Sequence, residues 1–321
     1  MPRLMSAAPH LNHPVGQAAA LAAALMWALA LVLFKVSGER IAPLALNLFK
    51  NTIGLALLLA TFAVLVPLGY EDLEPLHTLS AWKHTILFLS GVLGIAVADT
   101  LFFHALNLIG VGLISIVDCT YTPFMILFAW LMLGEQLGWW QYLGAALVVV
   151  GVFTAERHTL PVHRTRGQIA TGMLLAPLAV GLMAFGVVWA KPILEEVSLL
   201  WGTTLRLAGG LASLAVMTLV WPAWLPHWGV FRPTRAWRTA IPASVLGTYL
   251  SLLLWIAGFK YTDASIAGVL NQTTVVFSTV LAAVFLKERL GRRQVGALVL
   301  ALGGVVLLTL GDKLWTWCTP G

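Results

Sequence analysis

Two cations and two carboxylates, Lys50, Arg206, Asp99 and Asp118, lie well inside long apolar stretches of the sequence. A charged side chain deep in a bilayer costs about 3 kcal/mol on insertion scales, and such residues face protein or water. Groups of both signs can hold a ligand that itself carries both charges, exchange a proton, or pair with one another. The sequence leaves these readings open for Asp99 and Asp118.

Several uncharged polar and aromatic side chains also fall near the middle of apolar stretches. Internal aromatic residues commonly pack, but at this depth they also qualify as ligand-lining groups. The candidate binding residues are Asp118, Asp99, Trp27, Tyr121, Asn271, Gln272 and Tyr249. Lys50 and Arg206 are candidates for charge balance or coupling.

The composition predicts an integral membrane protein. Of 321 residues 60% are hydrophobic and 10% are charged, whereas soluble domains carry about 25% charged residues. The net charge of +6 lies mostly in short loops, so it indicates membrane topology and not nucleic-acid binding.

Ten apolar stretches are long enough to cross a bilayer as helices. They predict an all-α fold with ten transmembrane spans at 16–36, 44–67, 83–106, 110–133, 138–155, 168–191, 199–221, 239–258, 264–286 and 293–311.

Counting along these spans places Lys50, Asp99 and Asp118 roughly 10 Å from the same membrane face, at 1.5 Å per helical residue. At that shared depth the three side chains can meet. Arg206 and the Asn271–Gln272 pair lie at similar depth from the opposite face. Lys35 and Lys191, near span ends, are expected to extend to the nearest interface.

The chain repeats itself. An offset of 153 residues places Val245-Leu246-Gly247 on Val92-Leu93-Gly94 and Glu288 on Glu135, and an offset of 156 places Arg206 on Lys50. Equivalent helices are separated by five spans, an odd number, so we expect two inverted five-helix repeats. Repeats of this kind build secondary transporters with a site near the midplane.

The repeat sets the expected organisation. Glu135 and Glu288 begin loops and are expected to cap or bridge turns. The expected segments are an N-terminal tail at 1–15, a first repeat at 16–155, a linker at 156–167, a second repeat at 168–311 and a C-terminal tail at 312–321.

Three segments carry a family resemblance: ALMWALALVLFK, LGEQLGWWQYLGAALVVVGV and FLKERLGRRQVGALVLALGGV. With them the chain resembles the drug/metabolite transporter superfamily, EamA-type. The resemblance implies ten helices and movement of small metabolites, often amino acids or related zwitterions, by alternating access. Many members carry Arg where this chain has Lys50. Asp99 and Asp118 are not part of the general pattern, so the resemblance assigns them no role.

The expected function is therefore secondary transport of an amino acid or related zwitterion, with export as the preferred direction, through a cavity lined by spans 1, 3, 4, 6, 8 and 9. A multidrug exporter of the same superfamily and a non-transporting scaffold are the alternatives. The sequence contains no HExxH or GxSxG motif, so an enzyme is disfavoured. The expected partners are a small substrate, the lipid bilayer of a bacterial inner membrane and a coupling proton. No cofactor, metal or nucleic acid is expected, and monomer and homodimer stay open.

The orientation is the point on which two arguments differ. Of the 19 Lys and Arg residues, two lie inside spans, five lie on the side of the N-terminus and twelve lie on the other side. The positive-inside rule therefore places both termini outside, while the resemblance implies both termini inside.

Overall fold

The structure is a computed structural model, and it describes residues 13–38, 41, 43–102, 104–105, 108–109, 117, 120–155, 165–220, 222–274, 276–277, 280–281 and 292–318. The described part of the chain is all-helical and has no strand. Apolar runs that cross a membrane must satisfy their backbone groups internally, and helices do so within each segment.

The α-helices, in chain order, are α1 His13–Gly38, α2 Pro43–Leu65, α3 Glu74–Thr78, α4 Ala81–Gly91, α6 Tyr121–Phe128, α7 Trp139–Ala155, α8 Arg166–Glu196, α9 Leu199–Val220, α10 Trp237–Ser244, α11 Ser251–Tyr261, α12 Ala264–Asn271 and α14 Arg292–Cys318. Three π-helical segments are η1 Val92–Val97, η2 Ala129–Leu133 and η4 Val245–Leu250, and η3 Pro222–Phe231 is a 3₁₀ helix.

Six helical segments are long and apolar enough to span a membrane: His13–Phe34, Leu44–Leu65, Ala81–Phe102, Arg166–Glu196, Leu199–Val220 and Trp237–Tyr261. Tyr121–Leu133, Trp139–Gly151 and Val299–Leu310 are shorter apolar helices. The expected span at 264–286 is described as α12 and scattered further residues, so a count of ten stays a prediction.

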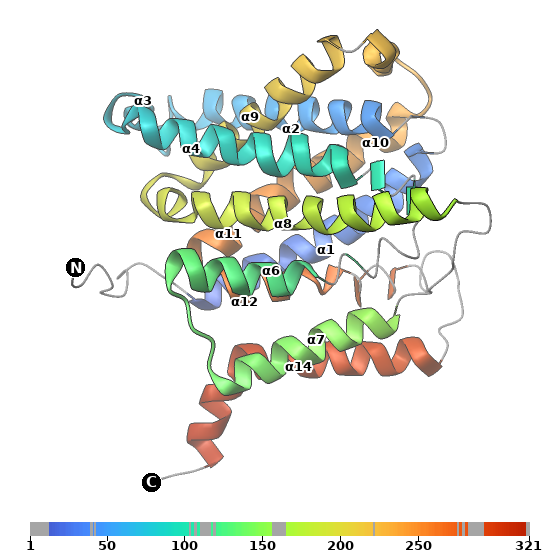
Figure 1. Cartoon of the computed structure of the whole chain (residues 1–321). Helices are drawn as coiled ribbons and strands as arrows, with labels where there is room; N and C mark the ends of the chain where they lie inside the picture. Colours follow the sequence, from blue (N-terminus) through green and yellow to red (C-terminus); the bar gives the residue numbers. More distant parts are fainter. Residues whose placement is uncertain are drawn as a thin grey trace.

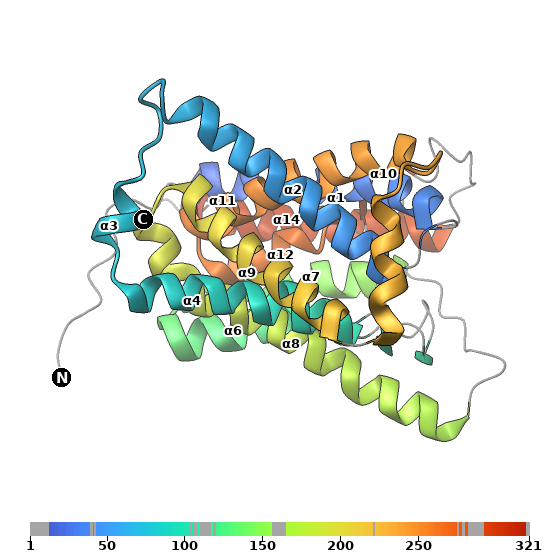
Figure 2. The ribbon, with the colours of Figure 1, turned by 90° about the horizontal axis from the view of Figure 1, so that it is seen from above.

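The helices lie side by side, and α1 begins at the end of the bundle where α14 finishes (Figure 1). Helices α7 and α14 pack together along one edge (Figure 1). The view from above shows α2 and α9 crossing the same face of the bundle, with α4 and α8 beside α9 (Figure 2).

The two halves pack against each other reciprocally. A Cβ atom added at Gly54 of α2 would lie 2.6 Å from Thr248 Cγ2 in η4, and one added at Gly210 of α9 would lie 2.5 Å from Ile95 Cβ in η1. These are equivalent pairs under the sequence offsets, which match Gly54 with Gly210 and Ile95 with Thr248. A two-fold relation between the halves predicts such a pair of contacts.

The π-helical segments η1 and η4 occupy equivalent positions, since both begin at the repeated Val-Leu-Gly sequence. A π-helical turn leaves one backbone group outside the regular ladder, and such turns are frequent at functional sites. Asp99 follows η1 by two residues, and Tyr249 lies within η4. The backbone is therefore irregular beside two of the candidate residues.

We expect Gly210→Ala to lower the free energy of unfolding by about 1–3 kcal/mol, because the new methyl group overpacks the contact with Ile95. Thermal unfolding of the purified protein in detergent measures the change. Gly167→Ala is the matched control, since a Cβ there meets nothing within 4 Å. Equal melting of both variants would contradict the close packing of α9 against η1.

Candidate functional site

Lys50 and Asp99 meet inside the bundle, as their shared depth predicted. Lys50 Nζ lies 3.9 Å from Asp99 Oδ2, and the two side chains are 15% and 19% exposed. Lys50 Nζ also lies 5.6 Å from the centroid of the Trp27 ring on α1, at cation–π distance. One cation, one carboxylate and one aromatic face therefore surround the same point.

The lysines of this protein differ in how their three N–H donors are used. Lys191 Nζ donates to Glu195 Oε1 at 2.7 Å, Phe259 O at 2.7 Å and Thr262 O at 2.8 Å. Lys260 Nζ donates to three carbonyl oxygens at 2.6–3.0 Å. Within the described residues Lys50 Nζ donates no hydrogen bond. An ammonium group has three donors, so Lys191 and Lys260 are saturated and Lys50 is not.

Two asparagines that the sequence analysis did not select extend this site. Asn47 and Asn51 of α2 are each 1% exposed, and Asn51 Nδ2 donates to Asn47 Oδ1 at 3.1 Å. Asn47 lies close to the Asp99 carboxylate, but its Nδ2 makes no hydrogen bond of ordinary length within the described chain. A spacing of four residues in an otherwise apolar span was the signal that could have identified them.

Arg206 of α9 is held differently, by direct hydrogen bonds in the packed interior. It is 3% exposed, and its Nη1 donates to Ser90 Oγ at 2.8 Å and to Gly186 O at 3.1 Å. The guanidinium carbon lies 5.9 Å from the Trp255 ring centroid. Arg206 thus joins α9 to α4, α8 and α11.

The other candidate residues have separate surroundings. Tyr121 of α6 is 6% exposed and interacts electrostatically with Arg206. The Tyr249 hydroxyl shares a 2.7 Å hydrogen bond with Thr61 Oγ1. Gln272 is buried, while Asn271 is partly buried and its Nδ2 has no partner among the described residues. Asp118 lies outside the described residues.

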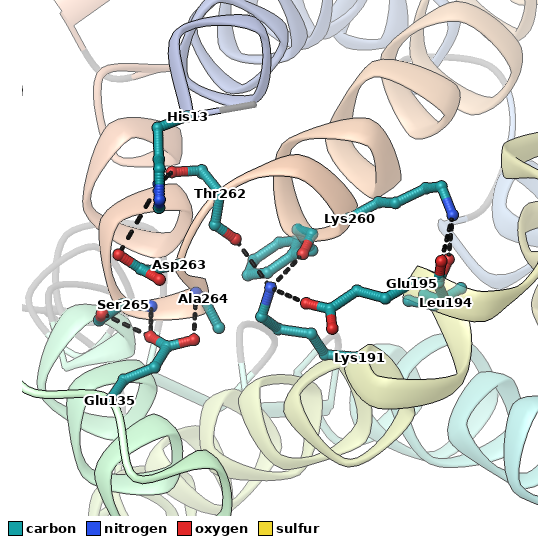
Figure 3. A network of polar contacts seen from close by, with 11 residues as sticks. His13, Glu135, Lys191, Leu194, Glu195, Lys260, Thr262, Asp263, Ala264 and Ser265 are labelled. Atoms are coloured by element: carbon teal, nitrogen blue, oxygen red, sulfur yellow. Dashed lines mark hydrogen bonds and ion pairs between the residues drawn. The ribbon is translucent and has the colours of Figure 1, made fainter. Parts of the chain in front are cut away.

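A second polar cluster lies at the end of the bundle where α1 begins (Figure 3). Gly134 ends η2 with a left-handed φ of 69°, a backbone conformation that favours glycine. The Glu135 carboxylate then accepts from the Ala264 N–H at 2.8 Å, the Ser265 N–H at 3.0 Å and the Ser265 hydroxyl at 2.7 Å. The expectation that Glu135 caps a turn is confirmed: it caps the start of α12. Glu288 lies outside the described residues.

The expectation that Lys191 extends to the membrane interface is wrong. Lys191 is 4% exposed, and its ammonium group caps the C-terminal carbonyls of α11 (Figure 3). The physical reason is that α8 continues to Glu196, one turn beyond the expected end at 191. Glu195 then lies four residues after Lys191 and pairs with it. The Lys35 side chain lies outside what the structure describes.

Long apolar helices in two homologous halves, with charged side chains buried inside the bundle, define a multi-pass membrane protein. A family model agrees: the EamA-like transporter family matches residues 14–155 and 170–310. The chain belongs to the EamA-like transporter family, and it is a transporter of the drug/metabolite transporter superfamily.

The same fold occurs among solved structures. A crystal structure described only as "Crystal structure of protein" superimposes with a TM-score of 0.76 over 95% of this chain and 99% of that one, at 20% sequence identity. This likeness concerns the fold alone. A search of curated proteins gave no match.

Removing the Ser90 hydroxyl by Ser90→Ala should cost about 1.5–3 kcal/mol of stability, because a hydrogen bond to a buried charge is lost. Arg206→Lys should cost more, since a lysine cannot hold Ser90 and Gly186 as a guanidinium does. Thermal unfolding of both single variants and the double variant tests the contact. We expect the double variant to lose at least about 0.5 kcal/mol less than the sum; strict additivity would contradict a direct interaction.

Proposed function

We propose that this protein is a secondary transporter of small zwitterions, of the amino-acid class, and that Lys50 and Asp99 bind the cargo. The observation that carries the proposal is that Lys50 Nζ donates no hydrogen bond to any described residue, although a carboxylate oxygen lies 3.9 Å away. The structural lysines of the same chain use all three donors.

The chemistry of the pair matches such a cargo. A substrate carboxylate offers Lys50 the hydrogen bonds that it lacks among the described residues, and a substrate ammonium group does the same for Asp99. Direct hydrogen bonds between ionised groups run at about 2.7–2.9 Å, so a pair at 3.9 Å is loosely held. A zwitterion bound between Lys50 and Asp99 therefore displaces only a weak contact. It replaces that contact by two strong charged hydrogen bonds.

Trp27 and Asn47 complete the proposed site. The Trp27 ring supplies an apolar and cation–π surface beside Lys50. The Asn47 Nδ2 group, which makes no hydrogen bond of ordinary length within the described residues, provides a further donor. We include Asp118, Tyr121, Tyr249, Asn271 and Gln272 as secondary candidates, since they lie in spans 4, 8 and 9, which were expected to line the cavity. Arg206 is assigned to the scaffold.

We propose alternating access as the mechanism, in which the cargo site is open to one membrane face at a time. The reciprocal packing of η1 and η4 supports this, because both π-helical segments lie where one half contacts the other. The proposed location is a bacterial inner membrane, and the proposed coupling ion is a proton.

Transport of a panel of labelled amino acids into and out of proteoliposomes tests the role of the pair. Lys50→Met and Asp99→Asn should each reduce transport at least about tenfold, since each removes a charged hydrogen bond to cargo worth about 1.5–3 kcal/mol. The matched control is the surface pair Lys83–Glu196, whose side chains are 37% and 51% exposed. Lys83→Met and Glu196→Gln should transport normally.

The double variant Lys50→Met/Asp99→Asn separates cargo binding from internal charge balance. If the pair only neutralises itself, removing both charges restores transport to near the wild-type rate. If the pair binds cargo, the double variant stays as inactive as the single variants while remaining folded. Recovery of transport in the double variant would overturn the proposed site.

A further inference from the structure

At the end of the bundle where α1 begins, polar contacts join five of the six spans that were expected to line the cavity, namely spans 1, 4, 6, 8 and 9. His13 of α1 lies 3.2 Å from Thr262 Oγ1 through its Nδ1. The remaining polar contacts are made at the ends of α8, α11 and α12 by Glu135, Lys191, Glu195 and Lys260.

Within this cluster one set of groups is not balanced in charge. Lys191 is neutralised by Glu195 at 2.7 Å, and the Lys260 donors are bound to carbonyl oxygens. The two carboxylates of Glu135 and Asp263 lie beside each other at the junction of α11 and α12 (Figure 3). His13 also faces Asp263, with its Nδ1 3.9 Å from Asp263 Oδ2, and Lys191 and Glu195 act on the same carboxylate.

We propose that Asp263, which lies beside Glu135 and His13, is a proton-binding site that holds this end of the transporter closed. The proposal rests on the alternating access proposed above. A proton on Asp263 removes its repulsion from the Glu135 carboxylate. Without that proton, two carboxylates lie beside each other, and separation of the helices into water is favoured.

The electrostatics of Asp263 give the direction of the effect. Burial, and next the Glu135 carboxylate, raise the pKa of Asp263 above that of an exposed aspartate, while His13 and Lys191 oppose the shift and Glu195 adds to it. A group whose pKa is raised in one conformation stabilises that conformation below this pKa and ceases to do so as the pH rises through it. The closed end is therefore favoured by acid and weakened by alkali.

The site exchanges its proton with water on its own face of the membrane. The His13 and Asp263 side chains are 45% and 33% exposed, and both lie at the end of the bundle. Opening hydrates Asp263 and lowers its proton affinity, so each opening at high pH releases a proton to that face. This arrangement makes the coupling site distinct from the cargo pair of Lys50 and Asp99.

The test follows the solvent access of a buried reporter, Ala267→Cys, one turn into α12 and 0% exposed. Cys119 and Cys318 are first replaced by Ser. The protein in lipid nanodiscs is labelled with a charged methanethiosulfonate between about pH 4 and 8, a range that begins at the ordinary carboxyl pKa and extends in the direction in which the pKa of Asp263 is shifted. Each rate is divided by that of Gln136→Cys, an exposed position on the same face, which cancels the pH dependence of the thiol itself.

We expect the normalised rate to rise about tenfold with pH, which corresponds to a shift of about 1.4 kcal/mol toward the open form as Asp263 loses its proton. In Asp263→Asn the amide imitates the protonated acid, so the rate should stay at its low-pH value. Asp72→Asn, the same change at an exposed loop position of that face, should behave as wild type. Glu135→Gln should move the midpoint to lower pH, because it removes the repulsion that raises the pKa of Asp263.

A pH-dependent rise that persists in Asp263→Asn, or a flat wild-type profile, overturns the proposal. If Asp263→Asn does not fold, an unshifted midpoint in Glu135→Gln overturns it equally. The assay contains no substrate, so its outcome is independent of whether Lys50 and Asp99 bind cargo. Conversely, if the transport assays contradict the cargo site but the labelling profile is as expected, the proton site is still supported.

Discussion

An ionised side chain inside a bilayer must find its partners within the protein or in water, and the helix arrangement around Lys50, Asp99 and Arg206 follows from this constraint. Arg206 meets it with hydrogen bonds that join α9 to α4 and α8. Lys50 and Asp99 satisfy the same constraint by lying beside each other, at a distance too long for a hydrogen bond. The same requirement therefore produces one rigid anchor and one pair that is open to exchange.

The repeat explains why these two cations differ. Lys50 and Arg206 are equivalent positions, and the contacts of their helices with η4 and η1 are equivalent too. The side chains that contact the two cations are not equivalent. Ser90 accepts a hydrogen bond from Arg206, whereas its repeat counterpart Ala243 has no side-chain oxygen. Asp99, beside Lys50, has Leu252 as its repeat counterpart. A repeated scaffold thus carries an asymmetric charge pattern.

The depth of the charged residues in the membrane could be predicted from the sequence, because it follows from counting residues along each apolar helix. The meeting of Lys50 with Asp99 and the capping role of Glu135 followed from span positions and the repeat. The role of Lys191 was missed because hydropathy does not mark where α8 ends once its charged last turn is reached. The π-helical turns were also missed, since uniformly apolar segments carry no periodic signal for one extra residue. His13 was assigned to a tail, and only tertiary contact brings it to Asp263.

The most direct test of the account is equilibrium binding of the standard amino acids to the purified protein, each compared with its N-acetyl and its carboxamide derivative. A site made of Lys50 and Asp99 requires both charges of the cargo. We therefore predict that at least one amino acid binds and that blocking either its amine or its carboxylate weakens binding at least about tenfold, the equivalent of about 1.4 kcal/mol. Equal binding of the amino acid and both derivatives, or binding of none of them, would contradict it.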